Sequence, residues 1–368
     1  FRVIAIRYLE DRGVLPTQSG QYRDVSLDVV RLKIEQTLKS GKKFSKSSKE
    51  IWQRLRFLFR DVNSGVYGIY VGHKWFESEL FEIDFDKYFT DNPMDDDLLA
   101  QVIDSICRGV GKNAAQIDFY DMGVEKVGDV YNELLGLRIV QNEKKEISLA
   151  ASSAKKKELG SYFTHPKLTQ LVSDGVLQYL RDRYKNRGDW LSISFCDNSC
   201  GSGHFLRQLI EDLSYELFTL EAATGGVKSQ NFYRRRLAQH CAFGIDRDIN
   251  AVWLTKLSLW LQTAENGKPF VFLDHHIVNG DSILSTMDRP DFKAADLQKL
   301  RKHCNNISSL KSETKEEVVQ ARKEWAEIPS VLRPYSRYIR PQTELFDIDP
   351  EKKTYFCYPQ TFPEIFLK

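Results

Sequence analysis

Hydrophobic residues recur at intervals of three and four over much of the first 140 positions, and this spacing predicts amphipathic helices. The expected helices are Phe1–Glu10, Val25–Leu38, Ser48–Val62, Leu98–Cys107 and Val124–Leu137. Ser47 or Ser48 is suited to cap the third of them. We therefore predict a mostly α-helical domain over residues 1–141.

The pattern changes after residue 141. A polar, lysine-rich stretch, Asn142–Leu159, predicts a linker or a mobile loop. The elements expected beyond it are helix Pro166–Tyr184, strand Leu191–Cys196, helix His204–Phe218, loop Ala223–Arg236, strand His240–Ile245, helix Ile249–Ala264 and strand Val271–Val278. Strands that alternate with helices predict an α/β fold with a doubly wound, mostly parallel sheet. This second domain spans residues 160–368, with a charged helical insertion at about 290–330.

Composition narrows the class of protein. The chain has 368 residues, 42% of them hydrophobic, and no apolar run is as long as the roughly 18 residues of a membrane span. The net charge of +2 neither requires nor excludes nucleic-acid binding. Six cysteines without a C-x-x-C pair predict free thiols in a reducing, cytoplasmic setting.

The stretch Phe195–Leu206 (FCDNSCGSGHFL) combines a strand end, an acid, a glycine turn and a helix start. Gly201 and Gly203 allow a tight bend and the close approach of a ligand. The dinucleotide fingerprint would need a third glycine where Leu206 stands, and no G-K-[ST] of a P-loop follows. The acid before the turn favours a positively charged ligand. The alternative is a tight strand–helix connection with no ligand.

Each of the three predicted strands is followed by an acid, namely Asp197, Asp246 or Asp281. The carboxyl ends of parallel strands line one crevice, so these acids should converge and repel one another unless a cationic or hydroxyl-rich ligand joins them. S-adenosylmethionine brings a ribose, an adenine and positive charge. The alternative is that each acid only caps the helix that follows it.

Four segments resemble motifs of the N6-adenine DNA methyltransferases, and most closely those of type IIG restriction-modification enzymes. They occur in the order of that family and are Gly160–Val172, Asp197–Leu206, Gly244–Val252 and Asn279–Leu284. Tyr8–Pro16, Ile117–Leu135 and the segment TFPEIF at the end are also similar to that family. The resemblance implies a Rossmann-like class I fold that transfers methyl groups from S-adenosylmethionine to double-stranded DNA.

The resemblance also implies roles for single residues. Tyr162 and Thr164 would hold the methionine end of the cofactor. Asp246 would accept the ribose hydroxyls, and Ile245 or Arg247 would flank the adenine. The full set of implied cofactor-binding residues is Tyr162, Thr164, Asp197, Ser199, Cys200, Gly201, Gly203, Asp246, Asp281 and Ser282. Within it, Asp197 and the turn would surround the methionine amino and carboxylate groups, and Asp281 and Ser282 would bind the adenine.

One departure from the family concerns catalysis. The tetrapeptide Asn/Asp/Ser-Pro-Pro-aromatic is absent, and we expect that the chain is cut or interrupted near it. We therefore predict a fragment that binds cofactor without transferring methyl groups, and we find no endonuclease motif. Two alternatives remain open: a non-catalytic scaffold or DNA-binding module with a vestigial fold, or a methyltransferase for RNA or protein.

Two further clusters carry side chains that could bind a metal or DNA. Asp274-His275-His276 would place its histidines on opposite faces of a strand, and no third ligand lies nearby, so no metal site is predicted. Arg234, Arg235 and Arg236, in the expected loop, are the best candidates for contacts with DNA phosphates.

Overall fold

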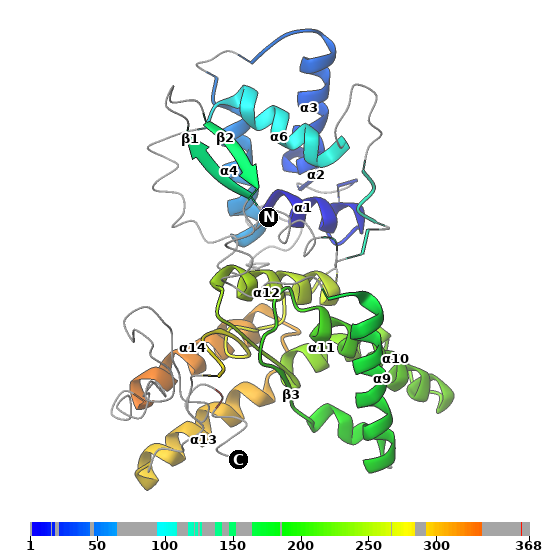
Figure 1. Cartoon of the computed structure of the whole chain (residues 1–368). Helices are drawn as coiled ribbons and strands as arrows, with labels where there is room; N and C mark the ends of the chain where they lie inside the picture. The colour runs from blue at the N-terminus through cyan, green and yellow to red at the C-terminus, as the bar shows by residue number, and fades with distance from the viewer. Residues whose placement is uncertain are drawn as a thin grey trace. The chain divides into compact units, whose positions relative to one another are not determined.

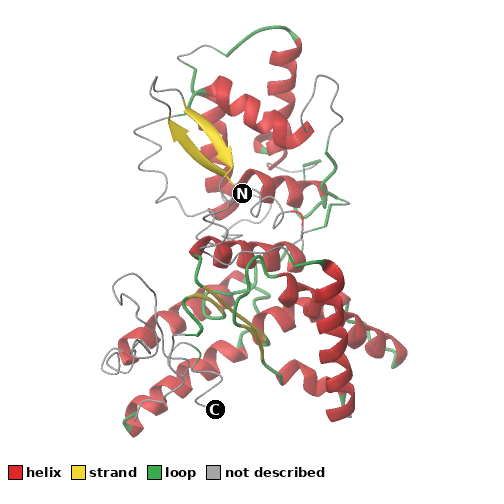
Figure 2. Ribbon diagram, viewed as in Figure 1, coloured by secondary structure: helices red, strands yellow, loops and turns green. Residues whose placement is uncertain are grey.

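The structure, a computed structural model, describes residues 2–15, 17–18, 22–44, 48–64, 94–108, 117–120, 122–123, 126, 137–141, 147–151, 164–184, 186–265, 267–283, 292–332 and 362. The chain divides into two compact units, Phe1–Gly123 with Ala264–Phe270 and Val124–Thr263 with Val271–Lys368. Figure 1 follows the chain by colour, and Figure 2 shows that helices predominate in the part it describes.

The described elements of the first unit are helices. Its described helices are α1 (Arg2–Asp11), α2 (Tyr22–Val25), α3 (Leu27–Lys39), α4 (Glu50–Ser64) and α6 (Asp96–Arg108). Four of the five expected helices begin and end within two residues of these bounds, and most of the fifth lies outside the described residues. Their apolar positions form a buried core that includes Ile6, Leu9, Leu27, Ile34, Ile51 and Leu58.

The start of α4 shows how a distant side chain completes a helix cap. Ser48 lies two residues before the start of the helix, where a cap was predicted, and its hydroxyl accepts the Glu50 N–H at 3.4 Å. The main cap is Asp96 of α6, whose carboxylate accepts the N–H groups of Ile51 at 3.3 Å and Trp52 at 3.1 Å. A buried carboxylate thus satisfies donors that the helix itself cannot.

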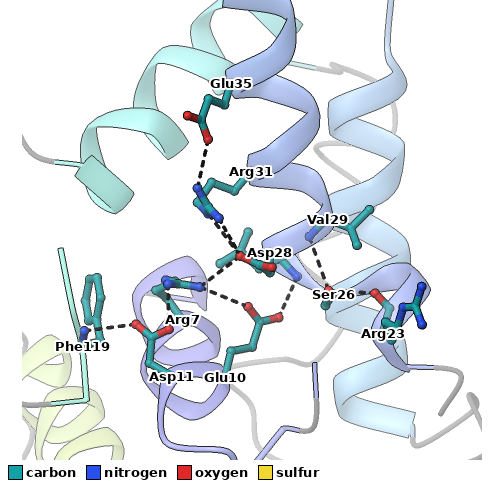
Figure 3. A network of polar contacts seen from close by, with 11 residues as sticks. Arg7, Glu10, Asp11, Arg23, Ser26, Asp28, Val29, Arg31, Glu35 and Phe119 are labelled. Carbon is teal, nitrogen blue, oxygen red and sulfur yellow. Dashed lines mark hydrogen bonds and ion pairs between the residues drawn. The ribbon is translucent and has the colours of Figure 1, made fainter. Parts of the chain in front are cut away.

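Charged side chains are buried between α1 and α3 (Figure 3). The Arg7 guanidinium, which is 4% exposed, pairs with Asp11 at 2.7 Å and with Asp28 at 3.7 Å. Glu10 accepts the first backbone N–H of α3 at 2.7 Å. Asp11 also accepts the Phe119 N–H at 3.1 Å, so the network links three segments of the first unit.

A three-stranded parallel sheet lies in the second unit. Its strands, hydrogen-bonded in the order given, are β3 (Phe195–Asp197), β4 (Ala242–Asp246) and β5 (Ile277–Asn279). The connecting and flanking elements are α9 (Pro166–Arg183), the 3-10 helix η1 (Arg187–Ser192), α10 (His204–Ala223), α11 (Gln230–His240) and α12 (Ile249–Thr263). Parallel strands joined through helices confirm the α/β character of this unit.

The two faces of β4 pack against different partners, because alternate side chains point to opposite faces. On one face Phe243 contacts Phe362, with ring centroids 5.5 Å apart and an interplanar angle of 84°. Ile245 lies in the same cluster. On the other face, a Cβ at Gly244 would come within 3.1 Å of the Leu206 side chain of α10. The glycine therefore lets α10 pack closely on the sheet.

The lysine-rich stretch is more ordered than predicted. Part of it forms β2 (Ile147–Ala151), which pairs with β1 (Leu137–Gln141) in an antiparallel hairpin, with Leu137 opposite Ala151. The expected linker is therefore wrong over these residues. The sequence of β2, ISLAA, alternates larger apolar residues with small ones, which is compatible with a strand. Nothing in that sequence indicated that β1 would be its partner.

The charged stretch at about 290–330 is helical, as expected. It consists of α13 (Ala294–Ser309) and α14 (Lys315–Leu332), which pack together around Leu300, Cys304, Ile307 and Ile328. Since both helices carry charged residues on their other faces, this buried seam accounts for their pairing.

Three further local predictions are wrong. The first strand was expected over Leu191–Cys196, but residues 191–192 belong to η1 and β3 begins at Phe195. The expected loop Ala223–Arg236 contains the start of α11, which is capped by the Ser229 hydroxyl accepting the Phe232 N–H at 3.2 Å. The third strand is shorter than expected, because residues 274–276 form a turn before β5. None of the helices in the described residues is long and apolar enough to cross a membrane.

Candidate functional site

The carboxyl ends of β3, β4 and β5 carry the predicted acids. Asp197 is the last residue of β3, Asp246 is the last of β4, and Asp281 follows β5 by two residues. The strands are parallel and adjacent, with Asp197 opposite Gly244 and Asp246 opposite Asn279. The three acids therefore lie along one edge of the sheet, as predicted.

Hydrogen bonds tie the loops of this edge to one another. The Ser282 hydroxyl, after β5, donates to the Asn198 carbonyl, after β3, at 2.8 Å. The Asn279 amide donates to the Asp246 carbonyl at 2.9 Å, and the Gly280 N–H donates to the same carbonyl at 2.9 Å. The edge is thus a single connected surface rather than three separate loops.

The glycine turn between β3 and α10 has the backbone that its sequence requires. Gly201 has φ +54° and Gly203 has φ +80°, both in the left-handed region. A Cβ at Gly203 would lie 3.1 Å from the Thr255 methyl group, whereas a Cβ at Gly201 would have no atom within 4 Å. The backbone at Gly201 is therefore open to a ligand, and that at Gly203 is packed.

Most backbone donors of the turn are used inside the protein. The N–H groups donate as follows: Ser199 to Asp197 Oδ1 at 3.0 Å, Cys200 to the Ile245 carbonyl at 2.9 Å, Gly201 to Asp246 Oδ2 at 2.8 Å and Gly203 to the Cys200 carbonyl at 2.7 Å. The bonds from Cys200 and Gly201 hold the turn against β4, and the other two lie within the turn. A ligand at this turn therefore has to bind the carboxylates of Asp197 and Asp246 and the open surface at Gly201.

The two carboxylates beside the turn are poorly neutralised. Burial raises the pKa of Asp197, the Ser199 N–H lowers it and the charge of Asp246 raises it further. Burial also raises the pKa of Asp246, against backbone hydrogen bonds from Asp248 and Gly201 that lower it. Among the described residues neither acid has an ion-pair partner, and Asp197 Oδ2 is buried without a hydrogen bond. The site favours a cation.

Asp281 and Ser282 complete the edge on the β5 side. Asp281 is 5% exposed, and its Oδ1 accepts the Ile283 N–H at 3.2 Å. Of the residues expected to flank an adenine, Ile245 is buried in the core, whereas Arg247 is exposed. Ile245 therefore cannot contact a ligand with its side chain.

Thr164 reaches the same edge through helix packing. Gln208 of α10 donates to Gln170 of α9 at 2.9 Å, and Ser173 donates to Asp212 at 2.6 Å, so the two helices run side by side in the same direction. The start of α9 thus lies beside the start of α10, at the glycine turn. Thr164 lies two residues before α9, next to the N-cap residue His165, and is half-buried. Tyr162 lies outside the described residues.

Thr255 belongs to the site but was not predicted. It lies on α12, and its hydroxyl donates to the Gly201 carbonyl at 2.8 Å while its methyl group packs against Gly203. The only sequence signal was a hydroxyl residue among the apolar positions of a buried helix. Asn279, whose side-chain amide donates to the Asp246 carbonyl, was likewise missed, although it directly precedes the Gly-Asp pair of the fourth motif.

The arginines proposed for DNA contacts lie on α11 rather than in a loop. Arg234 pairs with Glu211 of α10 at 2.5 Å. Arg235 is 1% exposed and donates to the carbonyls of Thr263 and Ser312. Arg236 is half-buried. Since Arg235 is enclosed, it cannot reach a phosphate, and the three side chains do not form one basic surface.

Other reactive groups do not form a second centre at this edge. Within the described parts of the chain, no cluster of three or more His, Cys, Asp or Glu side chains is arranged to hold a metal ion. The five described cysteines are free thiols, and burial raises the pKa of Cys200, next to the turn, well above its ordinary value. Cys200 is therefore a packing residue at neutral pH.

Comparisons with known proteins add no identification: the sequence matches no protein-family model and no curated protein. The residues at the carboxyl ends of the three strands are therefore the only guide to function.

Proposed function

We propose that this chain is the cofactor-binding part of an S-adenosylmethionine-dependent methyltransferase that modifies adenine N6 in double-stranded DNA. The observation that carries the proposal is the pair of partly buried carboxylates, Asp197 and Asp246, beside the open backbone of Gly201. Neither forms an ion pair with another described residue, although the charge of Arg247 lowers the pKa of Asp246. A ligand that satisfies them has to bring positive charge and hydroxyl donors. S-adenosylmethionine brings both, in its sulfonium and α-amino groups and in its ribose.

The residues at the edge fit this cofactor. The unpaired Asp197 Oδ2 would accept the α-amino group, because an ammonium is the donor that a buried carboxylate lacks. Asp246 would accept ribose hydroxyls on the lone pairs left by Gly201 and Asp248. Asp281 would accept the adenine amine. When bound, the cofactor supplies an electrophilic methyl group, and these residues hold and orient it.

The order β3-β4-β5 with helices between the strands supports the finer assignment to a Rossmann-like class I methyltransferase fold. The DNA partner follows from the resemblance of the four motifs. Phe362, from the segment expected near the catalytic motif, contacts Phe243 of β4 and so lies on the sheet that carries the site.

Discrimination between cofactors tests the proposal. Calorimetric titration of the chain should give saturable binding of S-adenosylmethionine and at least tenfold weaker binding of ATP. The physical reason is that ATP places phosphate charges where two carboxylates already repel each other. Equal affinity for the two nucleotides would contradict the assignment of the acids.

A second candidate function is a cofactor-binding module without catalysis. The absence of the Asn/Asp/Ser-Pro-Pro-aromatic tetrapeptide from the sequence favours it. That motif would accept the N–H bonds of a flipped adenine and stack on its ring. Incubation with methyl-labelled S-adenosylmethionine and DNA should therefore give no labelled DNA. Transfer by a pure sample would show that other residues of this chain perform the chemistry, and transfer to RNA or protein instead would contradict the DNA substrate.

A further inference from the structure

A cavity of about 190 Å³ lies at the opposite, amino edge of the same sheet. Its walls come from the residues just before each strand and from α13: Ser192 and Ser194 precede β3, Gln239 and His240 precede β4, His275 and His276 precede β5, and Ile307 and Ser308 belong to α13. One water needs only about 10–15 Å³, so the cavity can hold a small organic molecule. It shares no lining residue with the acidic edge.

One positively charged side chain lines the cavity. Among the described residues of the lining, Arg236 is the only one with a permanent charge, and none is Asp or Glu. Asp274, the nearest acid in sequence, is neutralised by Lys256 at 2.9 Å and by Arg322 at 3.9 Å. Among the described residues the Arg236 guanidinium forms no ion pair; its contact is with His240 Nε2, at 2.8 Å. A guanidinium has five N–H donors, so several remain for a ligand.

The imidazoles around the cavity are neutral hydrogen-bonding groups. Burial lowers the pKa of His240 to about 3, with the charge of Arg236 adding to the shift. Burial lowers the pKa of His275 to about 3 in the same way. His275 is 3% exposed, and its Nδ1 is buried without a hydrogen-bond partner. A buried polar nitrogen without a partner is unusual in a folded protein and points to a missing one.

From this arrangement we propose that the amino-edge cavity is a binding site for a small anion held by Arg236. The anion can be a carboxylate with an apolar body, which would pack on Leu191, Phe243 and Ile307, or an inorganic oxyanion such as phosphate. Both share the chemistry that a guanidinium and serine hydroxyls recognise. The proposal does not rest on the function proposed for the acidic edge.

Titration with benzoate and, separately, with inorganic phosphate tests the site on the full chain. We expect saturable binding of at least one probe at near-millimolar concentration, and tighter binding of benzoate if the apolar wall contributes. Arg236→Gln should weaken that binding at least tenfold. Arg183→Gln, which removes a charge from the exposed end of α9, should leave it unchanged.

A second variant distinguishes loss of the binding site from loss of folding. Ser308 is exposed on α13 at the cavity wall, so Ser308→Phe should preserve the fold and obstruct the cavity while Arg236 stays in place. Thermal unfolding close to that of the parent chain together with weaker probe binding would support the site. Absence of saturable binding for both probes, or equal binding by the Arg236→Gln and parent chains, would overturn the proposal. Titration with S-adenosylmethionine, whose proposed site is at the other edge, should not respond to either variant.

Discussion

At the residue scale, Gly201 and Gly203 share a left-handed backbone but have different neighbours. Gly201 faces open space, so a side chain there would affect a ligand. Gly203 is in tight contact with Thr255, so a side chain there would affect packing. Each alanine substitution should cost about 1–2 kcal/mol for the positive φ. Only Gly203→Ala adds a steric clash.

We predict that Gly201→Ala folds with a small loss of stability and binds S-adenosylmethionine at least tenfold more weakly, because its methyl group occupies ligand space. Gly203→Ala should lose markedly more stability than Gly201→Ala. Urea unfolding and calorimetric titration of both variants measure the two effects. Unchanged cofactor affinity in Gly201→Ala would show that no ligand approaches the turn there.

Asp197 illustrates a conflict between stability and binding. Its pKa is raised in the folded protein, so the folded carboxyl holds a proton more tightly than the unfolded one. The charged Asp197 side chain therefore lowers the free energy of unfolding at pH values above the raised pKa. This loss of stability disappears as the pH falls toward 3.8, the ordinary value. Cofactor affinity should fall over the same range, because protonation removes the charge that attracts a cation.

Asp197→Asn should accordingly stabilise the ligand-free chain. An asparagine oxygen can still accept the Ser199 N–H, while the buried charge is removed. We expect a gain of about 1 kcal/mol, seen as a rise of roughly 2–4 °C in Tm at pH 7. The difference from the parent chain should shrink as the pH is lowered. A lower Tm at pH 7 would mean that the charge stabilises the fold.

At the scale of elements, Thr255 fixes α12 against the glycine turn. Thr255→Val keeps the shape of the side chain and removes the bond to the Gly201 carbonyl. The variant should be less stable by about 1 kcal/mol, the usual net value of such a bond, and should bind S-adenosylmethionine more weakly because the turn is less constrained. Thr219→Val is the matched control, since Thr219 bonds only within the exposed face of α10, to the Tyr215 carbonyl. Equal effects of the two variants on cofactor affinity would remove the special role of Thr255.

The sequence predicted the edge that carries the acids for a simple geometric reason. Asp197, Asp246 and Asp281 follow successive strands, and parallel strands joined by helices must end at the same edge. Contacts that close this edge could not be predicted in the same way. The bonds from Thr255 to Gly201 and from Ser282 to Asn198 join residues about 50 and 80 positions apart, and no local pattern encodes them.

The missed elements have physical reasons of their own. The helix α11 contains three successive arginines, which suggested an exposed loop, but Tyr233 and Leu237 are one turn apart and buried. The prediction that His275 and His276 point to opposite faces assumed a strand. They lie in a turn, and their ring centroids are 4.0 Å apart.

Substituting Asp246 by alanine would also release the N–H groups of Gly201 and Asp248, so this variant cannot test ribose binding alone.

At the scale of the whole molecule, the division into two compact units predicts separable stability. Arg7 is buried among Glu10, Asp11 and Asp28 in the first unit. Arg7→Met should destabilise that unit by about 3–5 kcal/mol, because carboxylates are left buried without their cation. Amide hydrogen exchange resolved by segment measures the effect.

Faster exchange should appear in α1 and α3, whereas α10 and α12 of the second unit serve as the internal control and should keep their rates. The reason is that each unit has its own contacts and buried core. Equal acceleration in all four helices would mean that the chain unfolds as one cooperative body.

The most direct test of the central claim is the affinity of the full chain for S-adenosylmethionine, measured by isothermal titration calorimetry with and without the Asp197 charge. The claim is that unneutralised acids at the carboxyl edge of the sheet bind a cationic nucleoside. The parent chain should bind saturably, Asp197→Asn should bind about 10- to 100-fold more weakly, as expected for one charged hydrogen bond, and Asp182→Asn on the exposed face of α9 should match the parent. No saturable binding by the parent chain, or equal affinity in Asp197→Asn, would contradict the claim.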